Sequence, residues 1–181
     1  RMVAPVSTEM GCNNCHGGDW RMGVAGISPV PTKDFLTTHD RFNKTRLLAS
    51  AKAGKPLLCQ SCHPDPALNA KGNPKLLSMS ASIHGFHANF LTGRGAEACA
   101  LCHPSNPQGG TRFLRGVHHD AGLDCTNCHG TLEDHALSLL LAEKKAGKRG
   151  ADRLMKHLKP RMAPSIAEIK PRTPWLNEPD C

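Results

Sequence analysis

The stretch that decides the fold runs from Val117 to His135 and reads V-H-H-D-A-G-L-D-C-T-N-C-H-G-T-L-E-D-H. At its centre two cysteines are separated by two residues, and a histidine follows the second cysteine at once, in Cys125-Thr126-Asn127-Cys128-His129. Further histidines lie on both sides, at His118, His119 and His135. Thiols and imidazoles gathered this closely indicate that the stretch binds a metal or a group that contains one.

The same five-residue pattern occurs four times and uses eight of the nine cysteines. The other copies are Cys12-Asn13-Asn14-Cys15-His16, Cys59-Gln60-Ser61-Cys62-His63 and Cys99-Ala100-Leu101-Cys102-His103. In the C-x-x-C-H pattern both thiols bond covalently to a haem, and the histidine occupies one axial position on the iron. The four copies therefore predict four covalent haems of the c type.

At these four motifs the chain resembles the multihaem c-type cytochromes, which are electron carriers of bacteria and archaea. The resemblance implies electron transfer and no enzymatic activity of the chain itself. Because covalent haem attachment of this kind takes place outside the cytoplasmic membrane, it implies a periplasmic or extracellular location. The expected partners are other redox proteins or neighbouring cytochrome subunits. The resemblance also permits a polymeric form, a homo-oligomer or filament in which the haem chain continues across the junction between subunits.

Three other interpretations use the same cysteines. Zinc ribbons commonly place two cysteine pairs about 15–20 residues apart, whereas the first cysteines of successive motifs here stand 47, 40 and 26 positions apart. A disulfide framework suits an extracytoplasmic protein, but neither it nor zinc explains a histidine after every pair. The functional alternative is a segment of a multihaem oxidoreductase that reduces nitrogen or sulfur oxyanions at a haem with an open axial site. The surplus of histidines, and the lack of a C-x-x-C-K variant, favour the electron carrier.

Seven of the eleven histidines lie outside the motifs and are available for the second axial position of each iron. The predicted distal ligands are His39, His84, His87, His118 and His135. Four of them serve the haems of this chain, and one is left for a haem outside the segment. Ligation by two histidines leaves no open site for substrate and gives a lower potential than His/Met ligation. His119 is expected on the surface or beside a propionate, and His157 is a weaker candidate.

The composition predicts a mostly irregular fold with short α-helices, little or no β-structure and haem as its core. Aromatic residues make up only 4% of the 181 residues, and there is no Tyr, so porphyrins would supply the bulky apolar surface. Apolar periodicity and helix stop signals predict helices over residues 33–53, 75–91, 131–146 and 151–158. No stretch approaches the roughly 18 apolar residues of a membrane span.

Residues 1–159 are predicted to form a tetrahaem electron-transfer domain, followed by an extended tail over residues 160–181. Five prolines punctuate this tail, which favours extended backbone lying on another surface. The tail ends at Cys181, the one cysteine outside the four motifs. We expect Cys181 to be the first cysteine of a fifth motif in a longer cytochrome. The open alternatives are a free terminal thiol or an intermolecular disulfide.

The formal net charge of +8 at pH 7 resembles that of a nucleic-acid-binding protein. Each oxidised haem with two neutral imidazoles and two ionised propionates contributes about −1, so four haems bring the oxidised protein to about +4. The basic residues are therefore interpreted as partners of propionates and as solvated surface, and no nucleic-acid partner is predicted.

Overall fold

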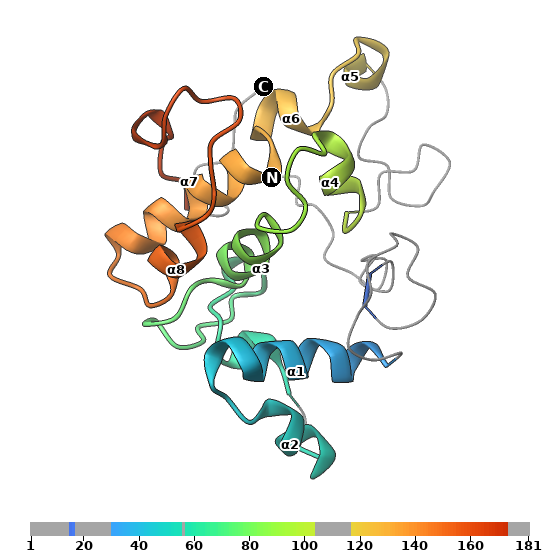
Figure 1. Cartoon of the computed structure of the whole chain (residues 1–181), viewed down its shortest axis with the longest axis vertical. Helices are drawn as coiled ribbons and strands as arrows, with labels where there is room; N and C mark the ends of the chain where they lie inside the picture. Colours follow the sequence, from blue (N-terminus) through green and yellow to red (C-terminus); the bar gives the residue numbers. More distant parts are fainter. Residues whose placement is uncertain (1–14, 17–29, 56, 104–116, 174–181) are drawn as a thin grey trace. The chain divides into compact units, whose positions relative to one another are not determined.

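The computed structural model describes residues 15–16, 30–55, 57–103 and 117–173 (Figure 1). These residues form short helices joined by turns, with no strand among them, and two isolated bridges link Asp65 to Ala70 and Leu76 to Arg149. The prediction of short helices with much irregular backbone and little β-structure is confirmed. Within the same residues, no helix is long and apolar enough to cross a membrane.

The chain divides into two compact units. The described residues of the first unit are 59–100 and 117–173, and those of the second are 15–16, 30–55, 57–58 and 101–103. The third motif is divided between them, with Cys99 in the first unit and Cys102 and His103 in the second. The described part of the predicted tail, residues 160–173, belongs to the first unit.

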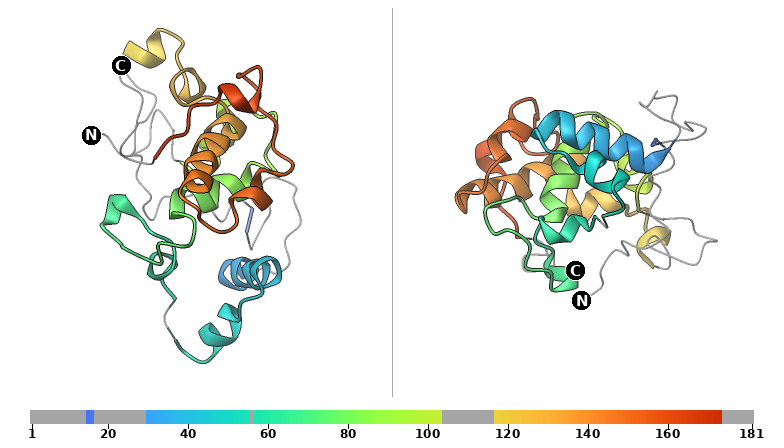
Figure 2. Two further views of the ribbon diagram at one scale, coloured as in Figure 1. Left: turned by 90° about the vertical axis from the view of Figure 1, so that its left-hand side faces the viewer. Right: turned by 90° about the horizontal axis from the view of Figure 1, so that it is seen from below.

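The core of the first unit is formed by three helices, α3 (Met79–His87), α7 (Leu132–Lys145) and α8 (Ala151–Met155). They lie side by side (Figures 1 and 2). Leu137 and Leu140 of α7 are fully buried. The helix α3 offers small residues to this core, and at Gly85 a Cβ atom would lie 3.0 Å from Leu140 Cδ1 and 3.1 Å from Leu154 Cδ1. The absence of a side chain at Gly85 therefore lets α3 approach α7 and α8 closely.

The helix α7 begins as its sequence predicts. The hydroxyl of the N-cap residue Thr131 accepts a hydrogen bond from the Asp134 amide at 3.3 Å, and the chain leaves the helix at Ala146. By contrast, α3 is shorter than the predicted helix over residues 75–91. Ser78 caps it by accepting from the Ala81 amide, and the residues before it are held elsewhere, since the Arg149 amide donates to the Lys75 carbonyl at 3.0 Å.

In the second unit the predicted helix over residues 33–53 is wrong, because the structure has two helices there, α1 (Pro31–Asn43) and α2 (Leu47–Lys52). Lys44 adopts the left-handed conformation with φ 54° and ends α1. The carboxylate of Asp40 then accepts hydrogen bonds from the amides of Leu47 at 2.8 Å and Leu48 at 3.0 Å. The Asp40 side chain thus accepts hydrogen bonds from the amides at the start of α2, which have no partner within that helix. This arrangement competes with a continuous helix.

The remaining helices are short, and three of them, α4, α6 and η2, include cysteines of the motifs. They are α4 (Ala96–Ala100), α5 (Val117–Asp120), α6 (Cys125–His129) and the 3-10 turns η2 (Cys59–Ser61), η3 (Pro66–Leu68) and η4 (Ile166–Glu168).

The described part of the tail is fastened to the start of α7. The Asp134 carboxylate accepts from the amides of Arg161 and Met162, each at 3.0 Å. The neighbouring carboxylate of Glu133 is buried, and it accepts from Arg161 Nε at 3.1 Å and from the Gly93 amide at 2.8 Å. Hydrogen bonds to charged acceptors are stronger than neutral ones. These bonds hold the tail over α7 and the fourth motif.

Candidate haem-attachment sites

The fourth motif is itself a helix, α6, and its first turn is fixed by a capping box. The Asp124 carboxylate accepts from the Thr126 amide at 2.7 Å and from its hydroxyl at 2.6 Å, while the Asn127 side chain accepts from the Asp124 amide. The hydroxyl of Thr126, helped by the backbone bonds, holds the pKa of Asp124 below its usual range. Helical spacing places Cys128 and His129 on the same face as Cys125. Cys128 and His129 line the cavity beside this motif, whereas the Cys125 thiol contacts Cys99.

A cavity of about 660 Å³ lies beside this motif. Its walls come from α6, α7 and the tail, and they include Cys128, His129, Met162, Ile169 and Pro171. Cofactor sites typically measure about 300–1,000 Å³ and are mostly apolar with a few polar groups. Lys170 and Arg172 also line the cavity and supply positive charge.

The hydrogen bonds of Arg172 indicate which kind of ligand this cavity fits. Its backbone amide donates to the Ser138 carbonyl at 2.9 Å, and its Nη2 donates to the His129 carbonyl at 3.2 Å. Its Nη1 is buried and makes no hydrogen bond to any residue that the structure describes. A buried guanidinium nitrogen calls for an acceptor, and a carboxylate is its natural partner. The cavity, the adjacent Cys128 thiol and His129 imidazole, and this cation fit a covalently attached haem, whose propionate Arg172 would hold.

The second motif is folded against the loop that follows it. The amides of Cys62 and His63 donate to the Cys59 carbonyl, and the Asn73 amide donates to the Cys62 carbonyl at 2.8 Å. A Cβ atom at Gly72, where φ is +50°, would lie 2.6 Å from the backbone nitrogen of Pro64, so glycine is required for this close approach.

The first motif is described only at Cys15 and His16, and Cys12 lies outside the described residues. His16 Nδ1 lies 2.8 Å from Oδ2 of Asp34, which is buried in the first turn of α1. The ring of Phe35 meets the His16 ring edge-on, with 4.8 Å between centroids.

The thiols of two different motifs meet where α4 packs against α6. Cys99, the first cysteine of the third motif, shares a hydrogen bond with Cys125, the first cysteine of the fourth. This bond lowers the pKa of Cys125 to about 7 and, together with burial, raises the pKa of Cys99. The attachment points of the third and fourth motifs therefore lie next to each other.

The motif histidine His129 lies near two of the predicted distal histidines. The ring of His135 on α7 lies 6.0 Å from that of His129 and 4.6 Å from that of His84 on α3, measured between centroids. The rings are close to perpendicular in both pairs. Helices α3, α6 and α7 thus gather three imidazoles in the first unit.

The other predicted distal histidines have different hydrogen-bond partners, and one side chain is outside the described part. His39 is on α1, and its Nδ1 lies 2.9 Å from the Thr45 hydroxyl. His87 ends α3 and bonds through Nδ1 to the Ile83 carbonyl. His118 belongs to the backbone of α5, but its side chain is outside the described part. His119 is exposed, with Nδ1 3.5 Å from the Asp120 carboxylate.

Sequence reasoning did not identify several residues of these sites. Asp34 and Arg172 stand 18 and 43 positions from the motif histidines that they contact. An acidic residue in a first helical turn and a basic residue in a Pro-rich tail are common, so neither gave a signal. Within the described residues no group of three or more His, Cys, Asp or Glu side chains is arranged to hold a metal ion, and no disulfide joins the cysteines.

Comparison of the chain with protein-family models, with curated proteins and with solved structures gives no match.

Proposed function

We propose that this chain binds four haems covalently and transfers electrons among them, as a carrier or conduit in the periplasm or outside the cell. The observation that carries the proposal is the cavity beside Cys128 and His129, with the buried Arg172 Nη1 in need of an anionic partner. The four C-x-x-C-H motifs of the sequence support the same chemistry at the other three sites.

The hydrogen bonds of the histidines also support this function. His63, His84 and His87 have a backbone carbonyl within 2.8 to 2.9 Å of Nδ1. A carbonyl only accepts, so Nδ1 carries the hydrogen and the lone pair of each neutral ring is on Nε2. Histidines that ligate metals are usually oriented by a bond of this kind at their other nitrogen.

The role of the protein is then to attach the haems, to orient their ligands and to tune their reduction potentials. Bound haem supplies the one-electron chemistry of its iron. The cysteines of each motif would hold a porphyrin at two points. The bonds at Nδ1 fix the ring planes of His63, His84 and His87, and the contact between Cys99 and Cys125 brings the first cysteines of two motifs together. Other redox proteins, or further copies of the chain, are the proposed partners.

The test is to produce the chain in a host with the machinery for c-type haem attachment and then to denature it in acidified acetone, which extracts haem that is not covalently bound. We expect four haems per chain by pyridine haemochrome and a matching increase in intact mass. The double variant Cys125→Ala/Cys128→Ala should retain three haems. Cys181→Ala, which removes the cysteine outside the motifs, should retain four.

Complete extraction of haem, or an equal loss in the Cys181→Ala control, contradicts the proposal. Electron paramagnetic resonance of the oxidised protein addresses the axial ligands. Four low-spin irons are expected if every haem has two histidines. A high-spin signal would favour the oxidoreductase alternative.

A further inference from the structure

Two motif histidines differ in the charge of the group that binds their Nδ1. His16 faces the carboxylate of Asp34, with 2.8 Å between Nδ1 and Oδ2. His63 faces neutral groups, the Leu77 carbonyl at 2.8 Å and the Ser82 hydroxyl at 3.0 Å. In both rings Nδ1 is the donor and Nε2 carries the lone pair. The first motif thus places its histidine against an acidic side chain, whereas the second places its histidine against a carbonyl and a hydroxyl.

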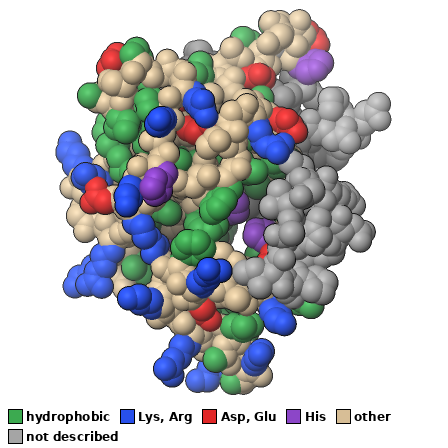
Figure 3. Space-filling view, viewed as in Figure 1, with side chains coloured by type: hydrophobic (Ala, Val, Ile, Leu, Met, Phe, Trp, Pro, Cys, Tyr) green, Lys and Arg blue, Asp and Glu red, His purple; other side chains and the backbone are tan. Residues whose placement is uncertain are grey.

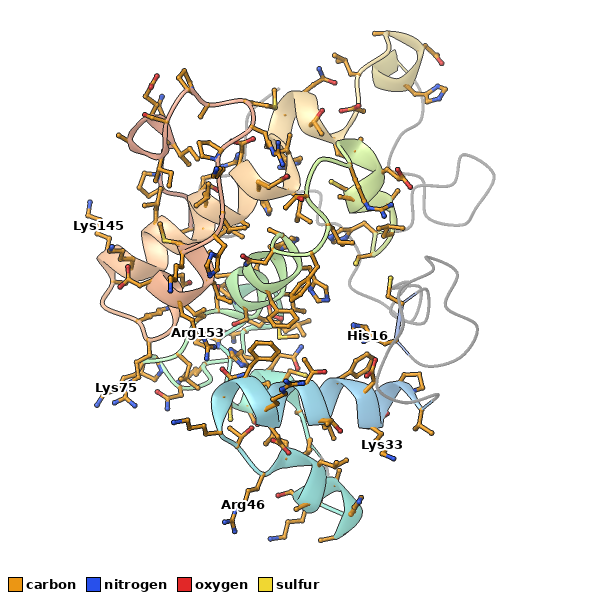
Figure 4. All side chains as sticks on the ribbon, in the orientation of Figure 1. His16, Lys33, Arg46, Lys75, Lys145 and Arg153 are labelled. Carbon is orange, nitrogen blue, oxygen red and sulfur yellow. The ribbon has the colours of Figure 1, made fainter. Side chains whose placement is uncertain are left out.

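The surroundings of Asp34 favour its charged form and limit screening by water. The residue is only 2% exposed, so water screens its charge weakly. It lies in the first turn of α1, behind Pro31 at the helix start, where the helix dipole favours a negative charge. Figure 4 shows His16 beside this end of α1. The Phe35 ring packs edge-on against the imidazole and covers part of it.

We propose that Asp34 is a positioning residue that lowers the reduction potential of the haem carried by His16 below that of the haem carried by His63. This inference rests on the proposed function. A carboxylate that accepts the Nδ1 hydrogen makes the imidazole a stronger electron donor to a metal. Its negative charge also favours the more positive, oxidised iron. Both effects act in the same direction, and the neutral Leu77 carbonyl and Ser82 hydroxyl at His63 carry no charge of this kind.

The consequence is a difference in reduction potential between the haems of the first and second motifs. Electrons would be held less firmly at the first motif, where Nδ1 of the histidine meets a carboxylate, than at the second, where it meets the neutral Leu77 carbonyl and Ser82 hydroxyl.

The experiment is a spectroelectrochemical titration of the holoprotein and of Asp34→Asn. Asparagine keeps an oxygen that accepts the Nδ1 hydrogen but removes the charge. One of the four midpoint potentials should rise and the other three should stay in place. Ser82→Ala is the matched control, because it removes a neutral partner from His63, and it should shift a different component by a smaller amount.

Two further variants show which midpoint potential belongs to which haem, and this assignment does not depend on how Asp34→Asn folds. Cys12→Ala/Cys15→Ala removes the first haem, and Cys59→Ala/Cys62→Ala removes the second. The component lost with the first motif should have the lower potential, and it should be the one that moves in Asp34→Asn. The inference is overturned if this order is reversed or if Asp34→Asn moves another component. A pyridine haemochrome count on the same samples distinguishes failure of this inference from failure of the proposed function. Fewer than four haems in the wild type contradicts the proposed function itself.

Discussion

At the scale of single residues, two histidines of α3 are oriented by bonds to nearby backbone. His84 and His87 each bond through Nδ1 to the carbonyl four residues earlier in α3. These carbonyls exist in every helix, so the pattern needs no special partner residue. Because the two rings take their orientation from the helix, their Nε2 atoms have fixed directions before any group binds.

Arg172 gives the first prediction at this scale. Arg172→Gln removes a positive charge from the cavity beside the fourth motif. Since a nearby cation favours the reduced state of a haem, we expect one midpoint potential to fall in a spectroelectrochemical titration. Arg172→Lys should produce a smaller change, because it keeps the charge but loses the planar fork. Arg153→Gln on α8 is the control for general charge loss, and an equal fall in that variant would contradict the assignment.

Asp124 gives the second prediction. Asp124→Ala removes the cap of α6, which typically costs about 1 kcal/mol, so amide exchange within residues 125–129 should become faster. The cap also depends on pH. Because the pKa of Asp124 is lowered in the folded chain, the cap is at full strength above the ordinary value of 3.8 and is lost as the pH falls through the lowered value. Mass-detected hydrogen exchange measures both effects.

The control for that measurement is Asp120→Ala, which changes an exposed acidic residue shortly before the motif. Exchange at residues 125–129 should be unchanged in this variant. Equal acceleration in the two variants would show that the Asp124 side chain does not act as a cap.

At the scale of elements, the close packing of α3 against α7 and α8 depends on Gly85. Gly85→Ala places a methyl group 3.0 Å from one leucine side chain and 3.1 Å from another. Such overpacking typically costs about 1–3 kcal/mol, and the helix must move to relieve it. His84 and His87 flank this residue, so we expect lower thermal stability and altered low-spin signals in electron paramagnetic resonance. Ala96→Gly at the start of α4 serves as a control away from this contact, and unaltered signals in Gly85→Ala would contradict the prediction.

The helices show which signals in a sequence are reliable. Thr131 predicted the start of α7 correctly, because an N-cap hydroxyl acts on the amide three residues later. The break at Lys44 was missed, since it depends on Asp40 reaching forward to the Leu47 and Leu48 amides. Local capping is visible in a pattern of residues, whereas a side chain that satisfies a different helix is not. The interruption of α1 is therefore a finding of the structure.

The distinction between local patterns and contacts formed by folding also applies to the candidate sites. The cysteine pairs and their histidines are adjacent in sequence, so the motifs were identified without a structure. The surroundings were not, because Asp34, Lys170 and Arg172 approach their motifs only through folding. The prolines predicted that the tail would be extended, but they gave no sign that it forms one wall of a cavity.

At the scale of the whole molecule, the charge should change with oxidation state. The formal charge is +8, and the face shown in Figure 3 carries Lys and Arg side chains spread widely over the described surface. With four haems the net charge falls to about +4 when oxidised and about 0 when reduced. We therefore expect a lower isoelectric point for the reduced protein in anaerobic isoelectric focusing. The Cys125→Ala/Cys128→Ala variant should show about three quarters of the change in charge, and identical isoelectric points in both states would contradict the prediction.

The contact between Cys99 and Cys125 bears on how such a molecule is assembled. The two thiols meet only once α4 lies against α6, although they are 26 positions apart in the chain. In that arrangement each sulfur faces the other and is partly withdrawn from solvent, which hinders its delivery to an attachment enzyme. Before the helices pack, the same cysteines lie on separate, accessible stretches. If haem is bound covalently at these motifs, as we propose, we expect each attachment to precede the packing of α4 against α6.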